Sequence, residues 1–385
     1  MNQSEKIRVA VLYGGRSGEH EVSLRSAANV IQYLDRSKFE VVPVGIDKQG
    51  AWFLGDEAIK KELAEHATLR LSCELEQLLF NPDAIGKSIQ PVKPAQLLPQ
   101  ANSAKQRIFD VVFPVIHGPL CEDGTVQGLL ELADVPYVGC GVLSSAIGMD
   151  KDVSKRLVKA AGIATAPYQV VKRGQWDRAS AEVLQSLSEM RFPVFVKPAN
   201  AGSSLGITKV KQIDALAAAI NNAFQYDAKV LVEQGIDAIE LEVAVLESLE
   251  NGAEPVVSVV GEVRSTHEFY SYDAKYVDEN GAELSIPAAI SPELQVKVRK
   301  AAADIFAALE CEGMARVDLF LERGSNQIYF NEVNTIPGFT SISMYPKLMQ
   351  ATGVSYSELL THLVLLATAR HQQKSKISRE YVGAP

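Results

Sequence analysis

The stretch that decides the fold runs from Gly313 to Pro346 and reads G-M-A-R-V-D-L-F-L-E-R-G-S-N-Q-I-Y-F-N-E-V-N-T-I-P-G-F-T-S-I-S-M-Y-P. Two apolar segments in it, Ala315–Leu321 and Gln327–Val333, are typical of neighbouring β-strands. A loop with a Pro-Gly pair follows the second segment directly, and such a loop can bring backbone N–H groups close to a ligand. The pattern therefore predicts a strand pair that leads into a binding loop.

Polar side chains interrupt both predicted strands. Side chains two positions apart leave the same face of a strand, so Arg316 shares a face with Asp318, and Glu332 shares one with Asn334. One face of the pair then offers a guanidinium, two carboxylates and an amide, and oxygen ligands of this kind suit Mg²⁺ bound to substrate phosphates. The alternative is a pair of amphipathic strands with a solvated face. Asp318 and Glu332 argue against it, because they interrupt otherwise apolar runs.

The 385 residues are enough for two or three domains with a large core. The formal net charge of −9 predicts no general attraction to nucleic acid or to an anionic membrane, so an anionic ligand needs a local cationic pocket. The sequence contains four cysteines, and they lack metal-binding spacing and suggest no disulfide framework. No stretch resembles a signal peptide or a membrane span, so we expect a soluble cytoplasmic protein with no membrane partner.

The two-strand pattern resembles the metal site of the ATP-grasp carboxylate–amine ligases. In that superfamily the Asp of an R-x-D strand and the Glu and Asn of an N-E-x-N strand hold two Mg²⁺ ions on ATP; here these are Asp318, Glu332 and Asn334. The tail N-x-x-P-G-x-T-x-x-S-x-x-P is more specific and resembles the D-alanine:D-alanine ligases of bacterial cell-wall synthesis. The resemblance covers nearly the whole chain, except that Gly55–Lys105 lacks specific matches.

Strands and helices alternate in the N-terminal third, which predicts an open parallel sheet with ligands at the carboxyl ends of its strands. Glu19 and His117 both follow such ends. The spacing at Gly14 is G-G-x-x-G rather than G-x-G-x-x-G, which disfavours a dinucleotide site. G-G-R-S-G-E-H-E-V-S-L instead resembles the ligases, which implies that Glu19 binds the ammonium of the first D-alanine and that His117 lies near that substrate. A solvated loop carboxylate and a core histidine remain the alternatives.

Two motifs in the middle of the chain imply phosphate binding. M-D-K ends at Lys151, and F-P-V-F-V-K-P places Lys197 at the end of an apolar strand; the resemblance implies that both lysines neutralise ATP phosphates. K-P-x-x-x-G-S-S-x-G resembles the glycine-rich lid of these enzymes, with Ser203 and Ser204 in it and Ser203 also touching the substrate side. The loop is not a Walker A motif, and a plain hairpin loop is the alternative.

The stretch E-Q-G-I resembles the adenine-binding hinge of the ligases. The resemblance implies that Glu233 contacts the amino group of the base, that the backbone at Gln234 and Ile236 pairs with the base, and that Glu240 takes the ribose hydroxyls. Spacing favours Glu240 over Glu242, and a surface strand residue is the alternative for either.

The stretch H-E-F-Y-S-Y-D-A-K-Y-V-D-E-N-G-A is aromatic, charged and without clear period, which predicts a long functional loop. It resembles the omega loop that closes over the phosphates in these ligases. The resemblance implies that Lys275 contacts the transferred phosphate and that Tyr276 forms a hydrogen-bonded set with Glu19 and Ser203. An aromatic-rich strand pair is the alternative.

The resemblance also assigns the acyl-transfer residues. It implies that Arg316 and the backbone N–H of Gly338 hold the oxyanion formed during attack. Ser343 and the backbone at Met344 would hold the carboxylate of the second D-alanine.

The predicted fold class is α/β, with α+β character in the grasp. We expect an N-terminal open parallel sheet domain over 1–140, a central ATP-grasp subdomain over 141–232, a C-terminal subdomain with the metal site and omega loop over 233–370, and a polar tail over 371–385.

The implied reaction joins two D-alanines with ATP through an acylphosphate, giving D-alanyl-D-alanine, ADP and phosphate. The implied cofactors are ATP and two Mg²⁺, with Mn²⁺ as a substitute, and a homodimer is expected. The alternatives are an ATP-grasp ligase with other substrates and a nucleotide-binding regulator without catalysis. The complete metal-ligand set argues against the regulator.

Overall fold

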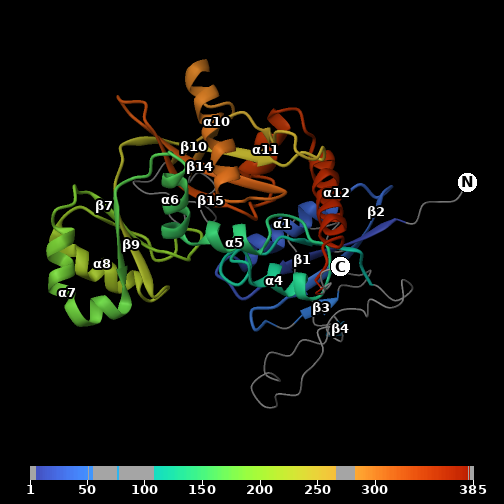
Figure 1. The fold of residues 1–385 in the computed structure, drawn as a ribbon, viewed down its shortest axis with the longest axis horizontal. Coiled ribbons are helices and arrows are strands. Elements are labelled where there is room, and N and C mark those ends of the chain that lie inside the picture. Colours follow the sequence, from blue (N-terminus) through green and yellow to red (C-terminus); the bar gives the residue numbers. More distant parts are fainter. Residues whose placement is uncertain are drawn as a thin grey trace, which may run out of the picture.

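The computed structural model folds the chain into three β-sheets with helices packed on them (Figure 1). In Figure 1 the green lobe with α7 and α8, the lobe with α10 and β14, and the lobe with β1 and β2 meet in the middle of the molecule. The residues that the structure describes are 6–50, 52–54, 76–77, 108–265, 282–379 and 381.

The N-terminal sheet has the strand order β4-β3-β2-β1-β5. Three adjacent strands run parallel, as the sequence predicts: β1 (Ile7–Gly14), β2 (Phe39–Ile46) and β5 (Val111–Pro114). The short strands β3 (Trp52–Leu54) and β4 (Glu76–Gln77) extend one edge in the antiparallel direction. Parallel strands are covered on both faces, which explains why their sequences are almost wholly apolar. Helices α1 (His20–Tyr33) and α4 (Thr125–Leu132) follow β1 and β5.

The central sheet is antiparallel with the order β6-β9-β7-β8. Its strands are β6 (Tyr168–Lys172), β7 (Val194–Pro198), β8 (Thr208–Val210) and β9 (Lys229–Gln234). The helices around it are α5 (Val142–Met149), α6 (Lys151–Ala160), α7 (Arg173–Leu187), the 3₁₀ turn η2 (Ile213–Ala215) and α8 (Leu216–Ala223). Because β9 continues to Gln234, the predicted boundary after residue 232 falls inside a strand.

The C-terminal sheet is antiparallel with the order β13-β12-β10-β14-β15, and β11 pairs with the end of β10. Its strands are β10 (Ala238–Leu246), β11 (Val256–Val257), β12 (Gly261–Ser265), β13 (Ala282–Ser285), β14 (Met314–Glu322) and β15 (Ile328–Asn334). The helices are α10 (Pro292–Ala308), α11 (Met344–Ala351) and α12 (Tyr356–Lys374).

The two faces of the C-terminal sheet have different roles. Leu241 and Val243 contribute to the core that includes α10, whereas Ala244 and Met314 contribute to the core that includes α11 and α12. Side chains alternate along a strand, so the second face continues from Ala244 and Met314 into Glu242 and Arg316. One face of this sheet is therefore apolar beneath α11 and polar beside it.

Helix ends follow local rules visible in the sequence. Ser291 caps α10 by accepting a hydrogen bond from the Leu294 N–H at 3.3 Å, and Pro292 follows it. Ser355 and Glu358 form a reciprocal capping box at the start of α12.

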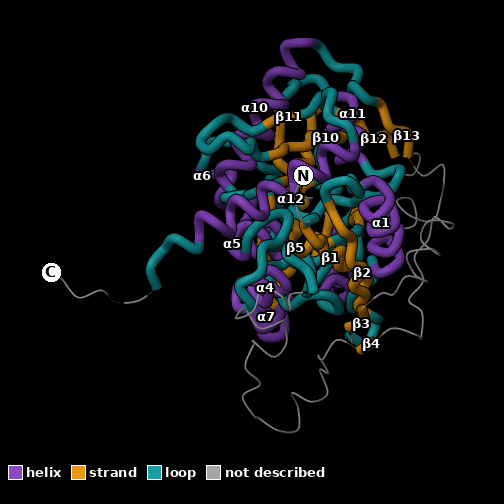
Figure 2. Tube along the Cα trace, turned by 90° about the vertical axis from the view of Figure 1, so that its right-hand side faces the viewer, coloured by secondary structure: helices purple, strands orange, loops and turns teal. Residues whose placement is uncertain are grey.

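The last helix, α12, packs on the N-terminal sheet rather than only on its own. Leu359, Leu360 and Leu363 lie in the same apolar core as Leu24 and Phe113. Figure 2 shows α12 close to β5, and the two elements are in contact. The N-terminal sheet and the C-terminal end of the chain thus share one core.

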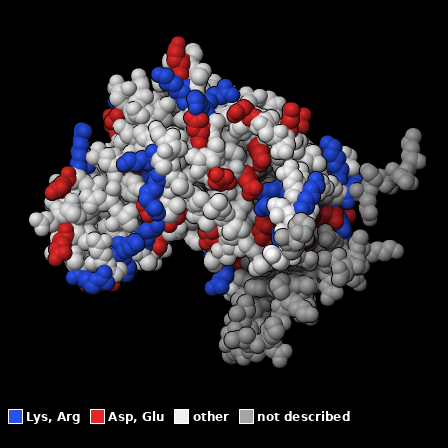
Figure 3. Space-filling model, in the orientation of Figure 1, with Lys and Arg blue, Asp and Glu red and all other residues white. Residues whose placement is uncertain are grey.

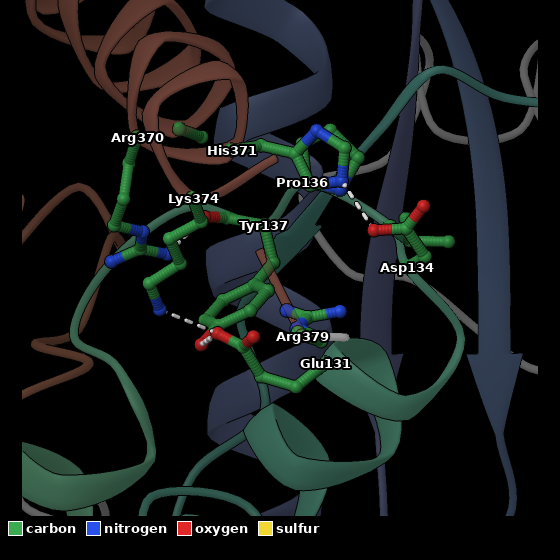
Figure 4. A pocket seen from close by; sticks show the side chains of 10 residues that line it. Glu131, Asp134, Pro136, Tyr137, Arg370, His371, Lys374 and Arg379 are labelled. Atoms are coloured by element: carbon green, nitrogen blue, oxygen red, sulfur yellow. Dashed lines mark hydrogen bonds and ion pairs between the residues drawn. The ribbon is translucent and has the colours of Figure 1, made fainter. Parts of the chain in front are cut away.

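Polar contacts extend this docking beyond the apolar core (Figure 4). The Arg370 guanidinium donates to the backbone carbonyls of Gly139 at 2.6 Å and Tyr137 at 2.7 Å. Lys374 donates to Glu131 at 2.7 Å. These contacts hold the last turn of α12 against the N-terminal lobe. The helix ends at Lys374, so the polar tail predicted over 371–385 begins inside the helix.

On the face that Figure 3 shows, acidic and basic side chains of the described residues are interspersed, with several basic side chains gathered on the left-hand lobe, which carries α7 and α8. This distribution is consistent with a modest net charge of −9. Across the described ranges, every helix is too short or too polar to cross a membrane.

Candidate functional site

The predicted polar face lies on two neighbouring antiparallel strands. In the register of β14 and β15, Arg316 is opposite Asn334 and Asp318 is opposite Glu332, with an irregularity directly after Asp318. The Arg316 guanidinium donates to both carboxylate oxygens of Asp318, each at 2.7 Å. The Asn334 amide donates to Asp318 at 3.0 Å. Hydrogen bonds therefore join Arg316, Asp318 and Asn334, and Glu332 lies opposite Asp318 on the neighbouring strand.

A third strand adds Glu242 to this group. On β10 it lies opposite Asp318, and its Oε2 is 2.9 Å from Nε of Arg316. Burial by itself would lower the pKa of Arg316, but the Asp318 and Glu242 carboxylates hold that pKa well above its ordinary value. Glu240, which we assigned to the ribose, lies two residues earlier on the same face of β10, opposite Phe320.

Lys151 joins the polar face to the glycine-rich loop. Its ammonium donates to the Ala201 carbonyl at 2.7 Å and lies 3.5 Å from Glu332 Oε2. The position is fixed by the start of α6, where Asp150 accepts backbone N–H bonds and also pairs with Lys229. The lysine predicted to meet phosphate thus lies between the loop and a predicted metal ligand.

A buried ion cluster lies behind this arrangement. Lys197 donates to Glu233 Oε1 at 3.1 Å, and Lys155 of α6 lies 3.0 Å from Glu233 Oε2. Lys155 also donates to the Phe330 carbonyl of β15 at 3.3 Å. Burial alone would raise the pKa of Glu233, but the two ammonium groups lower it below the ordinary value. Glu233 is therefore a carboxylate held in its ionised form.

The glycine-rich loop meets Glu19 across the boundary between lobes. Ser203 and Ser204 have φ of 48° and 61°, a conformation uncommon for residues with a side chain. The Ser203 hydroxyl donates to Glu19 Oε1 in a short contact. A Cβ on Gly202 would lie 2.7 Å from Glu19 Oε2, and a Cβ on Gly118 would lie 2.9 Å from it. Both glycines allow the close approach of the backbone to this carboxylate.

His117 connects the N-terminal sheet to the loop after β15. Its Nδ1 lies 3.1 Å from Glu122 Oε1 and 3.2 Å from the Ile336 carbonyl, and its Nε2 lies 3.2 Å from Ser26 Oγ. Ser26 in turn accepts the Phe339 N–H at 3.2 Å. Burial alone would lower the pKa of His117, but the contact with Glu122 raises it above its ordinary value.

Gly338 and Ser343 lie against each other in the loop that leads into α11. A Cβ on Gly338 would lie 2.7 Å from Ser343 Oγ, so glycine is required for this approach. Ser343 Oγ accepts the Thr340 N–H at 3.0 Å, and Met344 begins α11 with its side chain buried. The loop therefore brings two predicted substrate contacts together.

The structure narrows one predicted backbone contact to a single group of Gln234. The Gln234 N–H donates to the Pro167 carbonyl at 2.8 Å, because β6 continues its pairing with β9 to this point. Gln234 can therefore offer a ligand its carbonyl but not its N–H, and Ile236 follows in the connection to β10. Lys275 and Tyr276 lie outside the described residues, as does the whole predicted omega loop.

The donor set suits a metal ion that is shared with phosphate. Asp318 and Glu332 supply two carboxylates, and a half-turn of the Asn334 amide would present its oxygen beside them. Within the described ranges, no three Cys, His, Asp or Glu side chains form a closed metal cage. Mg²⁺ commonly binds one or two carboxylates and completes its shell with water and substrate phosphates, so an open set of this kind fits it.

Three site residues were given no role from the sequence: Lys155, Glu242 and Glu122. Lys155 is four residues after Lys151, the spacing that places two side chains on one face of a helix. Glu242 shares a strand face with Glu240, and Glu122 belongs to the H-G-x-x-x-E-D-G motif. The spacing signals were present, but each residue is equally typical of a solvated surface.

Comparison with known proteins gives full-length matches. Residues 8–140 match the family model described as D-ala D-ala ligase N-terminus, and residues 157–365 match D-ala D-ala ligase C-terminus. The chain is 53% identical over 385 residues to the D-alanine--D-alanine ligase A of Bradyrhizobium diazoefficiens, covering 99% of this chain and 100% of that protein.

Solved structures agree with this result. The D-alanine-D-alanine ligase from Coxiella burnetii matches with a TM-score of 0.78 and 34% identity, covering 97% of each chain. The VanG D-Ala:D-Ser ligase from Enterococcus faecalis matches with a TM-score of 0.77 and 37% identity, covering 94% of this chain and 100% of that one.

Proposed function

This chain belongs to the D-alanine–D-alanine ligase family, and we propose that the residues at the junction of its three lobes carry out the ATP-dependent ligation of two D-alanines for peptidoglycan precursors. The observation that carries the assignment is the position of Lys151, which contacts both the glycine-rich loop and Glu332. A phosphate between the loop and the carboxylate face would meet this ammonium.

Phosphoryl transfer to the first D-alanine needs positioning and charge neutralisation more than covalent chemistry. We assign neutralisation to Lys151 and Lys197, with Ser203 and Ser204 of the loop over the phosphates. Mg²⁺ held by Asp318, Glu332 and Asn334 would supply further charge stabilisation on the phosphate oxygens. Lys275 belongs to the same assignment on sequence grounds.

The second step is attack of the second amine on the acylphosphate carbon, which places negative charge on the acyl oxygen. We assign this charge to Arg316 and the Gly338 N–H, since one oxyanion donor is typically worth about 10²–10³ in rate. Asp318 and Glu242 fix the direction of the Arg316 guanidinium, so it would not need to reorganise during the reaction.

The substrates would bind on either side of this charge. Glu19, oriented by Ser203 and by Tyr276 of the omega loop, would take the ammonium of the first D-alanine, with His117 nearby. Ser343 and the backbone at Met344 would take the carboxylate of the second. On the nucleotide, Glu233, the Gln234 carbonyl and Ile236 would contact the base, and Glu240 the ribose.

The test is phosphate release with ATP and D-alanine against ATP and L-alanine, followed by identification of the product. A fold shared with a D-Ala:D-Ser ligase does not decide the acceptor, so D-serine and D-lactate should compete with D-alanine in the same assay. We expect D-alanyl-D-alanine to predominate at pH 7. Predominant D-alanyl-D-serine or depsipeptide would contradict the acceptor assignment, and phosphate release without D-alanine would contradict the reaction.

We further propose a cytoplasmic homodimer. The supporting features are three buried free cysteines, Cys121, Cys140 and Cys311, and large apolar side chains exposed on the neighbouring helices α4 and α5, namely Leu132 and Leu143. A second copy would cover such side chains. Light scattering coupled to size exclusion gives the mass directly, and a monomer at micromolar concentration would contradict the dimer.

A further inference from the structure

Lys155 is a buried lysine of the site that the roles above leave unused. Its side chain is 1% exposed, and burial lowers its pKa despite the carboxylate beside it. A buried charge is costly unless it is paired and hydrogen-bonded. Hydrophobic residues of similar volume often stabilise a fold as well as a buried ion pair does, so packing alone does not account for Lys155.

The contacts of Lys155 converge on one partner, Glu233. Lys155 approaches Oε2 at 3.0 Å while Lys197 approaches Oε1 at 3.1 Å, so one ammonium lies at each oxygen of the carboxylate. The hydrogen bond to the Phe330 carbonyl anchors the Lys155 ammonium to β15. Glu233 is therefore held from both sides, by a strand of the central sheet and by α6.

Glu233 Oε2 retains acceptor capacity. The oxygen is shielded from solvent, and the approach of Lys155 is not aligned as a hydrogen bond, so no donor among the described residues fills it. Buried polar atoms in proteins are rarely left without a partner. An ionised carboxylate can only accept hydrogen bonds, and with Lys155 at 3.0 Å the oxygen still has a lone pair that can accept a donor from a ligand.

We propose that Lys155 is a positioning residue that keeps Glu233 ionised and oriented to accept the amino group of an adenine base, and that it thereby sets the preference for ATP over a 6-oxo purine nucleotide. The inference rests on the assignment of Glu233 to the base in the proposed function. A 6-oxo group brings an acceptor to a carboxylate that can only accept, and sites built for one hydrogen-bond pattern reject the analogue that lacks it.

The experiment compares ATP with ITP, which differs at the 6-position and N1 of the base. Lys155→Met is measured with Lys155→Arg, Glu233→Gln and the double variant, and Lys159→Met is the matched control, because Lys159 is exposed on the same helix. Nucleotide affinity comes from calorimetry without D-alanine, and KM and kcat come from phosphate release. Thermal unfolding verifies that each variant is folded.

We expect Lys155→Met to weaken ATP binding and raise the KM for ATP by about tenfold, the loss typical of a hydrogen bond to a charged group. The ATP-to-ITP preference should fall by about the same factor while kcat changes little. Lys155→Arg should recover part of the preference, and Lys159→Met should match the wild type. In the Glu233→Gln background, Lys155→Met should add less than about twofold, because coupled residues are not additive.

Different results overturn different statements. If Glu233→Gln leaves ATP affinity and base preference unchanged, the base assignment in the proposed function is wrong. If Glu233→Gln has its effect but Lys155→Met lowers only kcat, or acts equally in both backgrounds, the positioning role of Lys155 is wrong. Should Lys155→Met not fold, Lys155→Gln repeats the test, because it keeps a donor toward Phe330 but carries no charge.

Discussion

Glu332→Gln should nearly abolish turnover while leaving the fold intact. The substitution keeps the shape of the side chain and removes one of the two carboxylates on the predicted metal face. In the structure Glu332 has a cationic neighbour, the Lys151 ammonium at 3.5 Å, and lies opposite Asp318 on the next strand. The change therefore affects charge at a position where charge is concentrated.

The geometry sets the scale of the effect. A unit cation at 3.5 Å from a carboxylate gains roughly 5 kcal/mol at an effective dielectric constant near 20, before dehydration is subtracted. If the attraction of a bound cation to the Glu332 carboxylate stabilises the transition state by about 3–4 kcal/mol, losing it lowers turnover by about 10²–10³. Stability should change by less than about 1 kcal/mol, because the Glu332 side chain is 27% exposed and Lys151 keeps its bond to Ala201.

The assay is phosphate release across a Mg²⁺ titration, with urea denaturation of the same samples. Glu322→Gln is the matched control, because it makes the same chemical change at the far end of β14. We expect the Glu332 variant to require more Mg²⁺ and to remain slow at saturation, and the Glu322 variant to match the wild type. A wild-type rate at limiting Mg²⁺ would refute the metal assignment, and a loss of stability as large as the loss of rate would refute the separation of charge from folding.

Two further predictions concern Glu19 and His117, two polar residues of the N-terminal lobe. Gly202→Ala would place a methyl group 2.7 Å from Glu19 Oε2, so we expect the KM for D-alanine to rise about tenfold with little change in melting temperature. Gly128→Ala is the control, because its methyl group meets no atom within 4 Å. An unchanged KM in Gly202→Ala would argue against Glu19 as a substrate contact. The pKa values of His117 and Glu122 are both raised, so the folded state binds protons more tightly than the unfolded chain does. Proton binding therefore stabilises the fold at low pH, and the contribution of His117 is lost as the pH rises above 6.5 through the raised pKa of its imidazole. Urea denaturation between pH 6 and pH 8 should show this decline in the wild type and a flatter profile in Glu122→Gln, and equal slopes would contradict the pairing.

The strands that position the site could be predicted from the sequence, because their polar and apolar residues follow a strong pattern. The strand pair that carries Arg316 and Asp318 was correct because polar residues at two-residue spacing in an apolar run leave few other interpretations. The parallel N-terminal sheet followed from the alternation of predicted strands and helices.

The sequence could not predict contacts that join distant segments. Lys155 of α6 meets Glu233 of β9, which is far away in the sequence, and before folding it resembles any lysine on an amphipathic helix. That the N–H of Gln234 is already bonded to Pro167 was not visible in the sequence, because the length of β9 and its pairing with β6 are tertiary properties. Helix α7 was not predicted, since its apolar residues Trp176 and Val183 are widely spaced among polar ones.

The docking of α12 on the N-terminal sheet also has a consequence for synthesis. Ribosomes release β1 first and α12 last, yet Leu359 and Leu363 belong to the core that β1 and β5 need. The first sheet must therefore wait, with the part of one apolar face that α1 does not cover left open, until α12 has been translated. A nascent chain in this condition is prone to aggregate and depends on chaperones for cover. Removing α12 would extend that interval indefinitely, so a C-terminal truncation should fail as a defect of solubility before it is noticed as a defect of catalysis.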